Sequence, residues 1–396
     1  MGFSDGESNF SIVPMHEGGI IKKISFRFTI TLHIDDKNTL VYIHNLLAVG
    51  NIRESGDECI FVVSDKQGIR KLISVFDKYK LNTTKFLDYL DFKLAFNLYH
   101  SRNGVLTEEL TCKLITLKIG MNSKRIRFNI PSNHIKITIY WLLGLIEGEG
   151  SFHLWRSDLI PVFSIVLTER QLPVLVKIKQ FLIENLGFDY DSIWKLNKTS
   201  AMGINIQKAR NNSKSSALFI IKDIRILHNY LTPFLDKLHL LSKKGQDFVD
   251  FKIITRAVYY GIHKEEKIRS LILKLSYNMN NFRLSNYSGK ISVDLLTKDE
   301  RDIIINTLPL IEHLWDGRIR DIKSRKIHHQ LESSVYKILK PSGELLTIQT
   351  LTESAKIVGV TVKTLSKHLD VDYAVNSRFT TVIKDHAIKR IKIYYK

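Results

Sequence analysis

Residues Tyr140–Phe152 read Y-W-L-L-G-L-I-E-G-E-G-S-F, an apolar run that carries three glycines and ends in two carboxylates. Taken as a helix, this stretch places Gly144 and Gly148 four residues apart on one face, where missing side chains let another backbone approach closely. We therefore expect this face to pack against a second helix.

The start of the chain repeats the pattern. Three residues recur at a constant distance of 142 positions: Gly2, Gly6 and Glu7 precede Gly144, Gly148 and Glu149. Two helices packed through these glycines would bring Glu7 and Glu149 together at one end. A pair of carboxylates from two halves of one chain can form a binding site for a divalent metal ion.

Two other interpretations of Tyr140–Phe152 compete with this one. A glycine-rich turn after an apolar run is also typical of a helix C-terminus or a tight turn. A membrane segment is excluded because the run from Ile135 to Ile146 is far shorter than the ~20 residues needed, and Lys136 lies inside it. The choice between a packed helix and a simple turn depends on whether the repeat extends beyond these two stretches.

The repeat continues beyond these two stretches. Residues Lys23–Ile34 alternate apolar and polar side chains with the period of a half-buried strand, and Val162–Thr168 matches them with a shift of 135. Later segments match in the same way: Phe61–Asp65 with Phe219–Asp223, and Asp88–Phe92 with Asp247–Phe251. The shift changes only between elements, where loops absorb insertions. The sequence predicts an α+β protein in which one αββαββα unit is used twice, with pseudo-two-fold symmetry.

These residues resemble the LAGLIDADG homing endonucleases. The nine-residue signature of that family lines up with Leu142–Gly150, and its first copy with Met1–Ser8, where Ser8 replaces the last glycine. The resemblance implies a homing-endonuclease fold and a catalytic carboxylate at the eighth signature position, which is Glu7 in the first copy and Glu149 in the second. It also implies Mg²⁺ as cofactor, held by Glu7 and Glu149.

Two lysines occupy equivalent places in the halves. Lys85 and Lys244 each precede an aspartate by three residues, just before the last helix of the unit. In the resembled family a basic residue here lies beside the metals, where a cation would stabilise developing phosphate charge. We expect Lys85 and Lys244 to be catalytic, with Lys243 as a rival. The alternative is a surface lysine near a helix start.

One face of the strand at Lys23–Ile34 carries hydrogen-bonding groups suited to base edges and phosphates. The outward set is Lys23, Ser25, Arg27, Thr29, Thr31 and His33. Glu169 and Arg170, which end the matching strand, and Lys243 are further candidates for DNA contact. A solvated sheet face would carry the same residue types.

The composition fits a nucleic-acid partner. The chain has 396 residues, with 59 Lys and Arg against 40 Asp and Glu, a net charge of +19 and pI near 9.6. Two isolated cysteines form neither a disulfide framework nor a zinc site. Because no basic amphipathic helix carries the charge, we expect no membrane partner.

The C-terminal part changes character. Val335–Leu346 is predicted to form a hairpin, and Leu351–Leu369 resembles a helix-turn-helix with its turn at Gly359. Such a unit looks like the small DNA-binding domains that trail intron-encoded nucleases. It would place these residues near the major groove: Thr361, Lys363, Thr364, Ser366, Lys367 and His368. Many helix hairpins bind nothing, which is the alternative.

The predicted organisation has four parts. They are residues 1–130 and 131–262 as the two halves, 263–332 as a helical extension, and 333–396 as the helix-turn-helix domain. The predicted activity is metal-dependent double-strand cleavage of a long double-stranded DNA target by a monomer. We expect a mitochondrial, or otherwise organellar, intron-encoded protein.

Two alternatives stay open. The resembled family also contains RNA maturases that bind their own group I intron RNA and assist splicing, with or without cleavage activity. The second alternative is a regulator that binds DNA only through Leu351–Leu369. This alternative does not explain why the core is duplicated.

Overall fold

The computed structural model describes residues 1–131, 133–188, 202–209, 214–286, 295–313, 318–330, 333–348, 350–375 and 381–393. The chain divides into two compact units. The first contains residues 1–187, 202–259 and 263–306, and the second contains residues 188–201, 260–262 and 307–396.

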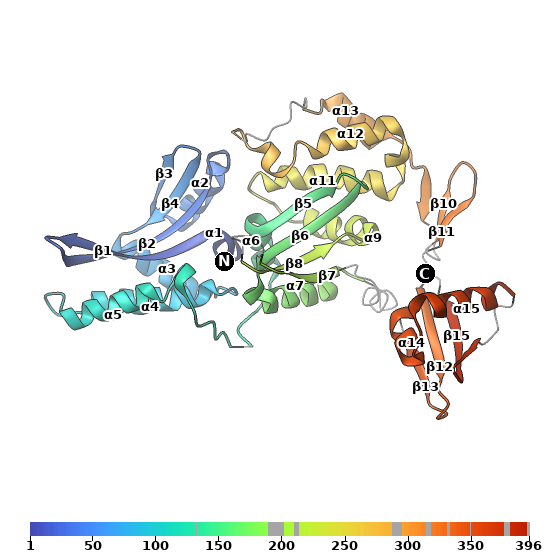
Figure 1. Ribbon diagram of the computed structural model, residues 1–396. Coiled ribbons are helices and arrows are strands. Elements are labelled where there is room, and N and C mark those ends of the chain that lie inside the picture. Colours follow the sequence, from blue (N-terminus) through green and yellow to red (C-terminus); the bar gives the residue numbers. More distant parts are fainter. Residues whose placement is uncertain are drawn as a thin grey trace. The chain divides into compact units, whose positions relative to one another are not determined.

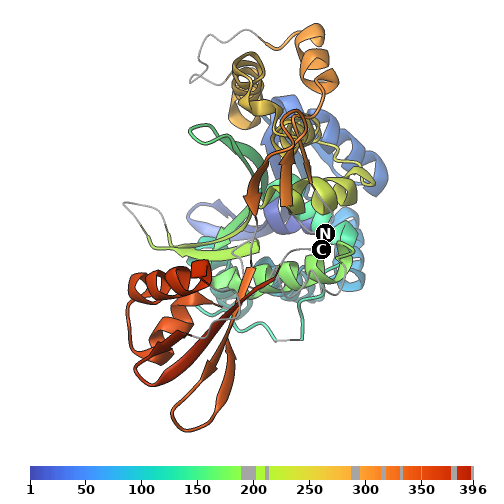
Figure 2. The same ribbon diagram turned by 90° about the vertical axis from the view of Figure 1, so that its right-hand side faces the viewer.

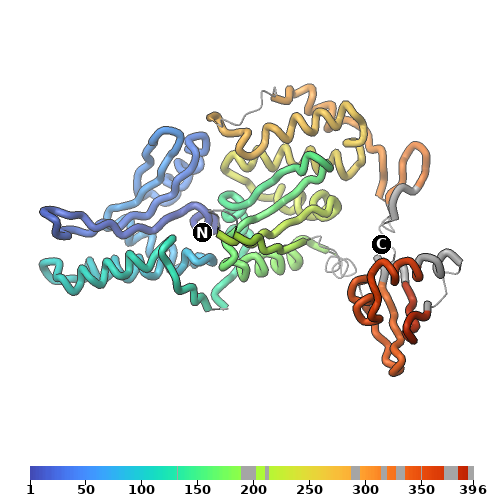
Figure 3. The backbone as a smooth tube through the Cα atoms, viewed as in Figure 1, coloured from blue at the N-terminus to red at the C-terminus, as the bar shows by residue number. Residues whose placement is uncertain are grey.

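The first unit contains the duplicated core, and its first half spans α1 to η2. The elements of this half are α1 (Gly2–Glu7), β1 (Ser8–Glu17), β2 (Ile20–His33), η1 (Ile34–Asp36), α2 (Lys37–Leu47), β3 (Asn51–Ser55), β4 (Glu58–Val63), α3 (Lys66–Lys78), α4 (Lys85–His100), α5 (Glu108–Ile119) and η2 (Asn122–Lys124). A linker then leads into the second half, as the tube in Figure 3 shows.

The second half repeats this order, and a further helix follows it. Its elements are α6 (Ile139–Glu149), β5 (Gly150–Trp155), β6 (Ile160–Thr168), η3 (Glu169–Gln171), α7 (Leu172–Asn185), β7 (Met202–Gln207), β8 (Ser216–Ile221), α9 (Ile224–Ile226), a π-helical turn η4 (Leu227–Leu231), α10 (Thr232–Asp236), α11 (Lys244–Tyr259), η5 (Ile262–Lys264), α12 (Glu266–Ser276), η6 (Asn280–Arg283) and α13 (Lys298–Asn306).

Each half builds an antiparallel sheet with the same strand order. The orders are β1-β2-β4-β3 and β5-β6-β8-β7. Helices α1 and α6 lie side by side between the two sheets, and α4 and α11 each lie along the sheet of their own half (Figure 1). The predicted duplicated α+β architecture is thereby confirmed.

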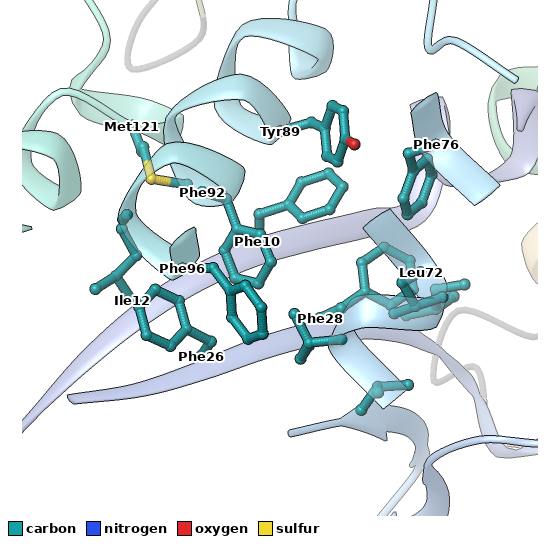
Figure 4. Close-up of a cluster of buried hydrophobic side chains, with 14 of the residues drawn as sticks. Phe10, Ile12, Phe26, Phe28, Leu72, Phe76, Tyr89, Phe92, Phe96 and Met121 are labelled. Atoms are coloured by element: carbon teal, nitrogen blue, oxygen red, sulfur yellow. The ribbon is translucent and has the colours of Figure 1, made fainter. Parts of the chain in front are cut away.

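Aromatic side chains dominate the core of the first half (Figure 4). Phe10 of β1 lies 5.2 Å from Phe28 of β2 and 5.3 Å from Phe92 of α4, measured between ring centroids. In the second half, Phe152 makes the same contacts with Phe163 and Phe251, at 5.2 and 5.3 Å. Phe10 and Phe152, which are 142 positions apart like the glutamates, therefore occupy equivalent core positions.

The boundary predicted at residue 262 is corrected by the structure. Asn122 donates from Nδ2 to the carbonyl of Phe10 at 3.0 Å, and Asn280 donates to the carbonyl of Phe152 at 2.8 Å. Arg125 and Arg283, three residues further on, donate to Asp88 of α4 and to Asp247 of α11. Helix α12 and η6 are thus the second copy of α5 and η2, inside the repeat and not in an extension.

The second unit ends in a small domain of sheet and helices. Its described elements are β9 (Ile311–His313), β10 (Arg318–Asp321), β11 (Ile327–Gln330), β12 (Ser333–Leu339), β13 (Leu345–Ile348), α14 (Leu351–Val358), α15 (Val362–Val375), β14 (Thr381–Ile383) and β15 (His386–Ile393). Strands β9 to β11 form one sheet, and the other four strands pair in the order β13-β12-β15-β14.

The predicted hairpin and helix pair are present in this domain. Gly343 turns β12 into β13 with φ +85°, and Gly359 ends α14 with φ +69°. Helices α14 and α15 lie along one side of the sheet (Figure 2), where Ala355 and Leu365 share one hydrophobic core with Ile338. The helix pair is therefore fixed on a sheet, and its contact with DNA stays a prediction.

Among the described residues, no helix combines the length and the apolar character that a membrane crossing requires.

Candidate active site

The site begins at the crossing of α1 and α6. A Cβ atom on Gly2 would lie 1.8 Å from the carbonyl oxygen of Trp141, and one on Gly144 would lie 2.6 Å from the backbone nitrogen of Phe3. Where the helices end, a Cβ on Gly6 would lie 3.4 Å from the Cα of Gly148. The glycines therefore let the two backbones touch, as the sequence predicted.

The two signature glutamates emerge together from this crossing. A Cβ on Gly148 would meet Oε1 of Glu7 at 3.3 Å, and one on Gly6 would meet Cγ of Glu149 at 3.3 Å. Burial raises the pKa of Glu7, and the charge of Glu149 raises it further. Burial also raises the pKa of Glu149. Each carboxylate packs on the other helix, so the site collects negative charge that needs a cation.

Lys85 and Lys244 lie at this centre. The Lys85 ammonium donates to the carbonyl of Gly6 at 2.9 Å, and the Lys244 ammonium donates to the carbonyls of Gly148 and Gly150 at 3.2 and 2.5 Å. Burial lowers the pKa of both lysines, while nearby carboxylates, including Glu7 and Glu149, act in the opposite direction. The helix crossing thus brings two partly buried ammonium groups beside two partly buried carboxylates.

Two further carboxylates, which were not predicted from the sequence, hold the segments that carry these lysines. Asp5 accepts hydrogen bonds from the backbone of Asn82 at 2.8 Å and of Thr83 at 3.0 Å, and from Nε1 of Trp141 at 2.7 Å. Burial raises its pKa, against the effect of these hydrogen bonds.

Glu147 does the same in the second half. It accepts hydrogen bonds from the backbone nitrogens of Leu241 and Ser242, just before Lys244. Asp5 and Glu147 are 142 positions apart, the same distance as Glu7 and Glu149, so the repeat offset was the signal that could have identified them. They are positioning residues, because they act through the backbone before Lys85 and Lys244.

Lys243 is not at this centre. Its ammonium pairs with Asp35, and its backbone nitrogen donates to Asp36 at 2.7 Å. Burial would raise the pKa of Asp35, but the hydrogen bonds from Lys243 and Ser285 lower it to about 2. Lys243 therefore ties η1 to the start of α11, and the structure does not support it as the rival of Lys244 or as a free cation for DNA.

The outward residues of β2 lie on one face, as predicted. Ile24, Phe26, Phe28 and Ile30 are buried, and the residues between them alternate to the other side. Lys23 and Arg27 are exposed, while Ser25, Thr29 and Thr31 are partly exposed. The face predicted to contact DNA is therefore available.

His33 departs from that prediction. Its Nδ1 lies 3.0 Å from Asp35, and its Nε2 lies 2.7 Å from the side-chain oxygen of Asn286. Both ring nitrogens are engaged within the protein, so His33 joins the two halves instead of facing a ligand.

Glu169 and Arg170 lie in η3 directly after β6, and both are exposed. Arg170 stacks over the ring of Phe128 in the linker at 4.1 Å. In the C-terminal domain, Thr361, Lys363, Thr364 and Lys367 are exposed and Ser366 is partly exposed. The hydroxyls of Thr361 and Thr364 lie 2.8 Å apart and Thr361 accepts from the backbone of Thr364, so this threonine caps α15.

Comparisons with known proteins show which family this chain resembles. The family model described as LAGLIDADG endonuclease matches residues 1–96 and 142–255, one stretch in each half. The relatives in sequence include two from yeasts. The uncharacterized mitochondrial protein RF1 of Saccharomyces cerevisiae is 28% identical over 73% of this chain and 60% of its own length. The probable intron-encoded endonuclease Cox1-I1b of Schizosaccharomyces pombe is 28% identical over 69% of this chain and 67% of its own length.

Solved structures share the fold. The LAGLIDADG homing endonuclease I-GzeII, in complex with its DNA target, aligns with a TM-score of 0.59 and 24% identity over 71% of this chain and 97% of its own. I-LtrWI, bound to target DNA, aligns with a TM-score of 0.59 and 22% identity over 70% of this chain and 95% of its own. The family model matches both halves, including α1, residues 142–149 of α6 and both glutamates, and the chain therefore belongs to the LAGLIDADG endonuclease family.

Proposed function

We propose that this protein is a site-specific DNA endonuclease that cuts both strands of a long target. The observation that carries the proposal is the pairing of Glu7 and Glu149 beneath the helix crossing, each beside a partly buried lysine. Membership of the endonuclease family and the DNA-bound state of the structural neighbours support it.

The donor chemistry of the site fits a divalent metal ion. Glu7 and Glu149 offer carboxylate oxygens, the donors that Mg²⁺ prefers. In the described part of the chain, no three His, Cys, Asp or Glu side chains gather to hold a metal alone, so phosphate and water oxygens would complete the shell. A bound Mg²⁺ would lower the pKa of water and stabilise charge on the phosphate and the leaving oxygen.

The chain's own groups supply the remaining requirements. Lys85 and Lys244 keep positive charge at fixed, partly buried positions where a phosphate would gain negative charge, and such a preorganised cation stabilises that charge. The outward face of β2, with Lys23 and Arg27, offers donors to phosphates and bases. With a net charge of +19, we expect DNA affinity to fall steeply with salt concentration.

We also propose that helix α15 contacts the same DNA. Lys363 and Lys367 lie one helical turn apart and are exposed. If each ammonium neutralises a phosphate, changing both to Ala should lower the slope of log K against log salt by about 2. Changing exposed Lys113 of α5 to Ala is the control. An unchanged slope in the Lys363/Lys367 variant would show that these two lysines do not contact DNA phosphates.

The test of the function is a selection of cleaved sites from a random DNA library, with Mg²⁺ or with EDTA. The proposal predicts one long, non-palindromic consensus that appears only with the metal. An uncut library would leave RNA maturation, which a splicing assay with the host group I intron measures directly.

The origin and the acting form of the protein are also proposals. The mitochondrial and intron-encoded relatives support an organellar origin, with the mitochondrion as the proposed compartment. Each chain is proposed to act as a monomer, because one chain holds both crossed helices and both glutamates.

A further inference from the structure

The two halves present different chemistry on equivalent strand faces. Strands β2 and β6 are the second strands of their sheets, and each pairs with its neighbours in the same order. Phe28 and Phe163, 135 positions apart, both face the core and are 1% exposed. The same offset therefore relates the residues on the opposite, outward faces.

Three outward positions differ between these strands. Ser25, Arg27 and Thr31 of β2 correspond to Ile160, Val162 and Val166 of β6. The register supports each match. Thr31 pairs with Ile60 of β4, and Val166 pairs with Leu218 of β8, the equivalent strand. At these three positions a hydrogen-bonding side chain in the first half is thus replaced by a branched hydrocarbon in the second, whereas Thr29 between them corresponds to Ser164, another hydroxyl.

The apolar face of β6 is accessible at several points. Val166 is 41% exposed and Trp155, which pairs with Ile160, is 39% exposed. Ile160 is partly exposed, whereas Val162 is buried. The Lys222 ammonium lies 5.3 Å from the centre of the Trp155 ring, so one cation borders the apolar face. An exposed apolar strip beside a cation fits a ligand with a small apolar group close to an anion.

The major groove of DNA offers one such group. The C5 methyl of thymine is the apolar group among the base edges there, and it lies near the phosphates of its own strand. Val166, Ile160 and Trp155 can bury a methyl, but their hydrocarbon surfaces cannot replace the hydrogen bonds that polar side chains make to a base. The first half, with Ser25, Arg27 and Thr31, has donors at the equivalent positions.

We propose that the second half reads its half-site through thymine methyl groups, whereas the first half reads its half-site through hydrogen bonds. This proposal rests on the DNA endonuclease function proposed above. The half-site of the second half must then contain thymine at the contacted positions. Exchanging thymine for uracil removes the methyl and keeps every base-pairing group, so it isolates this interaction.

The experiment measures binding of the full chain, with Ca²⁺ in place of Mg²⁺, to the selected target and to two versions in which uracil replaces all thymines of one half-site. Each contacted methyl that is removed should weaken binding about fourfold, the equivalent of ~0.8 kcal/mol for a buried methyl-sized group. The weakening should be confined to one half-site. Equal sensitivity of both half-sites, or of neither, would overturn the proposal.

Reciprocal variants then assign the half-sites. Ile160→Ser/Val166→Thr gives β6 two of the three polar residues of β2 and should reduce the uracil effect, since Trp155 remains. Ser25→Ile/Thr31→Val should create one in the other half-site. If either double variant fails to fold, the single variants Val166→Thr and Thr31→Val provide the test, since both positions are on the surface. A uracil effect that the β6 variants leave unchanged would contradict the assignment.

This outcome is separable from failure of the proposed function. A protein that finds no specific site and cuts no DNA would refute the endonuclease proposal. A protein that cuts a selected site lacking thymine in both half-sites would retain that function and refute only the methyl contact.

Discussion

The ammonium of Lys85 donates a hydrogen bond of 2.9 Å to the carbonyl of Gly6, the residue directly before Glu7. Its counterpart, Lys244, donates to Gly148, directly before Glu149. Each lysine is therefore fixed to the backbone that carries a catalytic candidate.

This relationship predicts the effect of removing either charge. Lys85→Met and Lys244→Met should each slow cleavage by about 10²-fold or more, because a fixed cation would no longer face the developing phosphate charge. DNA binding should change little. Time courses of supercoiled, nicked and linear plasmid measure this. Lys113→Met on α5 is the matched control. A lysine variant that cuts at the normal rate would assign that side chain a structural role.

The paired glutamates predict a cost in stability. Burial and the charge of Glu149 raise the pKa of Glu7 above its ordinary value of 4.5. At a pH between the ordinary pKa and the raised pKa, the folded protein therefore binds more protons than the unfolded chain. Stability contributed by this group therefore falls as pH rises through that window. Glu7→Gln should raise Tm at neutral pH by about 2 °C or more, since removal of a site charge often stabilises a protein.

The pH dependence distinguishes this cause from others. At pH 4, where the wild-type carboxyl is protonated, the Tm difference between Glu7→Gln and wild type should be nearly absent, because the raised pKa of Glu7 lies above that pH. Thermal melts without metal at several pH values test it. A difference that is independent of pH would show that the charge of Glu7 is not its source.

The helix crossing predicts a specific intolerance. Gly144→Ala places a Cβ 2.6 Å from the backbone nitrogen of Phe3, which neither helix can relieve without shifting. We expect a loss of about 1–3 kcal/mol or more in the free energy of unfolding. Gly120→Ala, where the new atom would lie an ordinary 3.4 Å from the carbonyl oxygen of Leu117, is the control. Equal denaturant midpoints for the two variants would contradict the close crossing.

The sequence was sufficient for the features that depend on local periodicity and on the repeat offset. Glu7, Glu149 and the core match of Phe10 with Phe152 all follow from the constant distance of 142 positions. The repeat of Met121-Asn122 and Arg125 as Met279-Asn280 and Arg283 was also visible in the sequence. These matching residues lie at the end of each half. Because helical periodicity alone does not distinguish the last helix of a repeat from an added helix, the boundary of the second half was placed too early.

Contacts between the halves could not be predicted. His33 and Lys243 both looked like free donors, but in the structure His33 contacts Asn286 of the other half and Lys243 pairs with Asp35. The position equivalent to Asp35 in the second half is occupied by Arg170. The ion pair between Asp35 and Lys243 therefore has no copy in the repeat. Such asymmetric contacts depend on how loop residues approach across the pseudo-two-fold axis, which strand and helix patterns do not encode.

The most direct test of the account is plasmid cleavage by Glu149→Gln and Glu7→Gln, each compared with wild type at the selected site. We predict that both variants bind the target, and that neither produces linear plasmid at a measurable fraction of the wild-type rate. Undiminished double-strand cleavage by either variant would contradict the assignment of the paired glutamates as the catalytic centre.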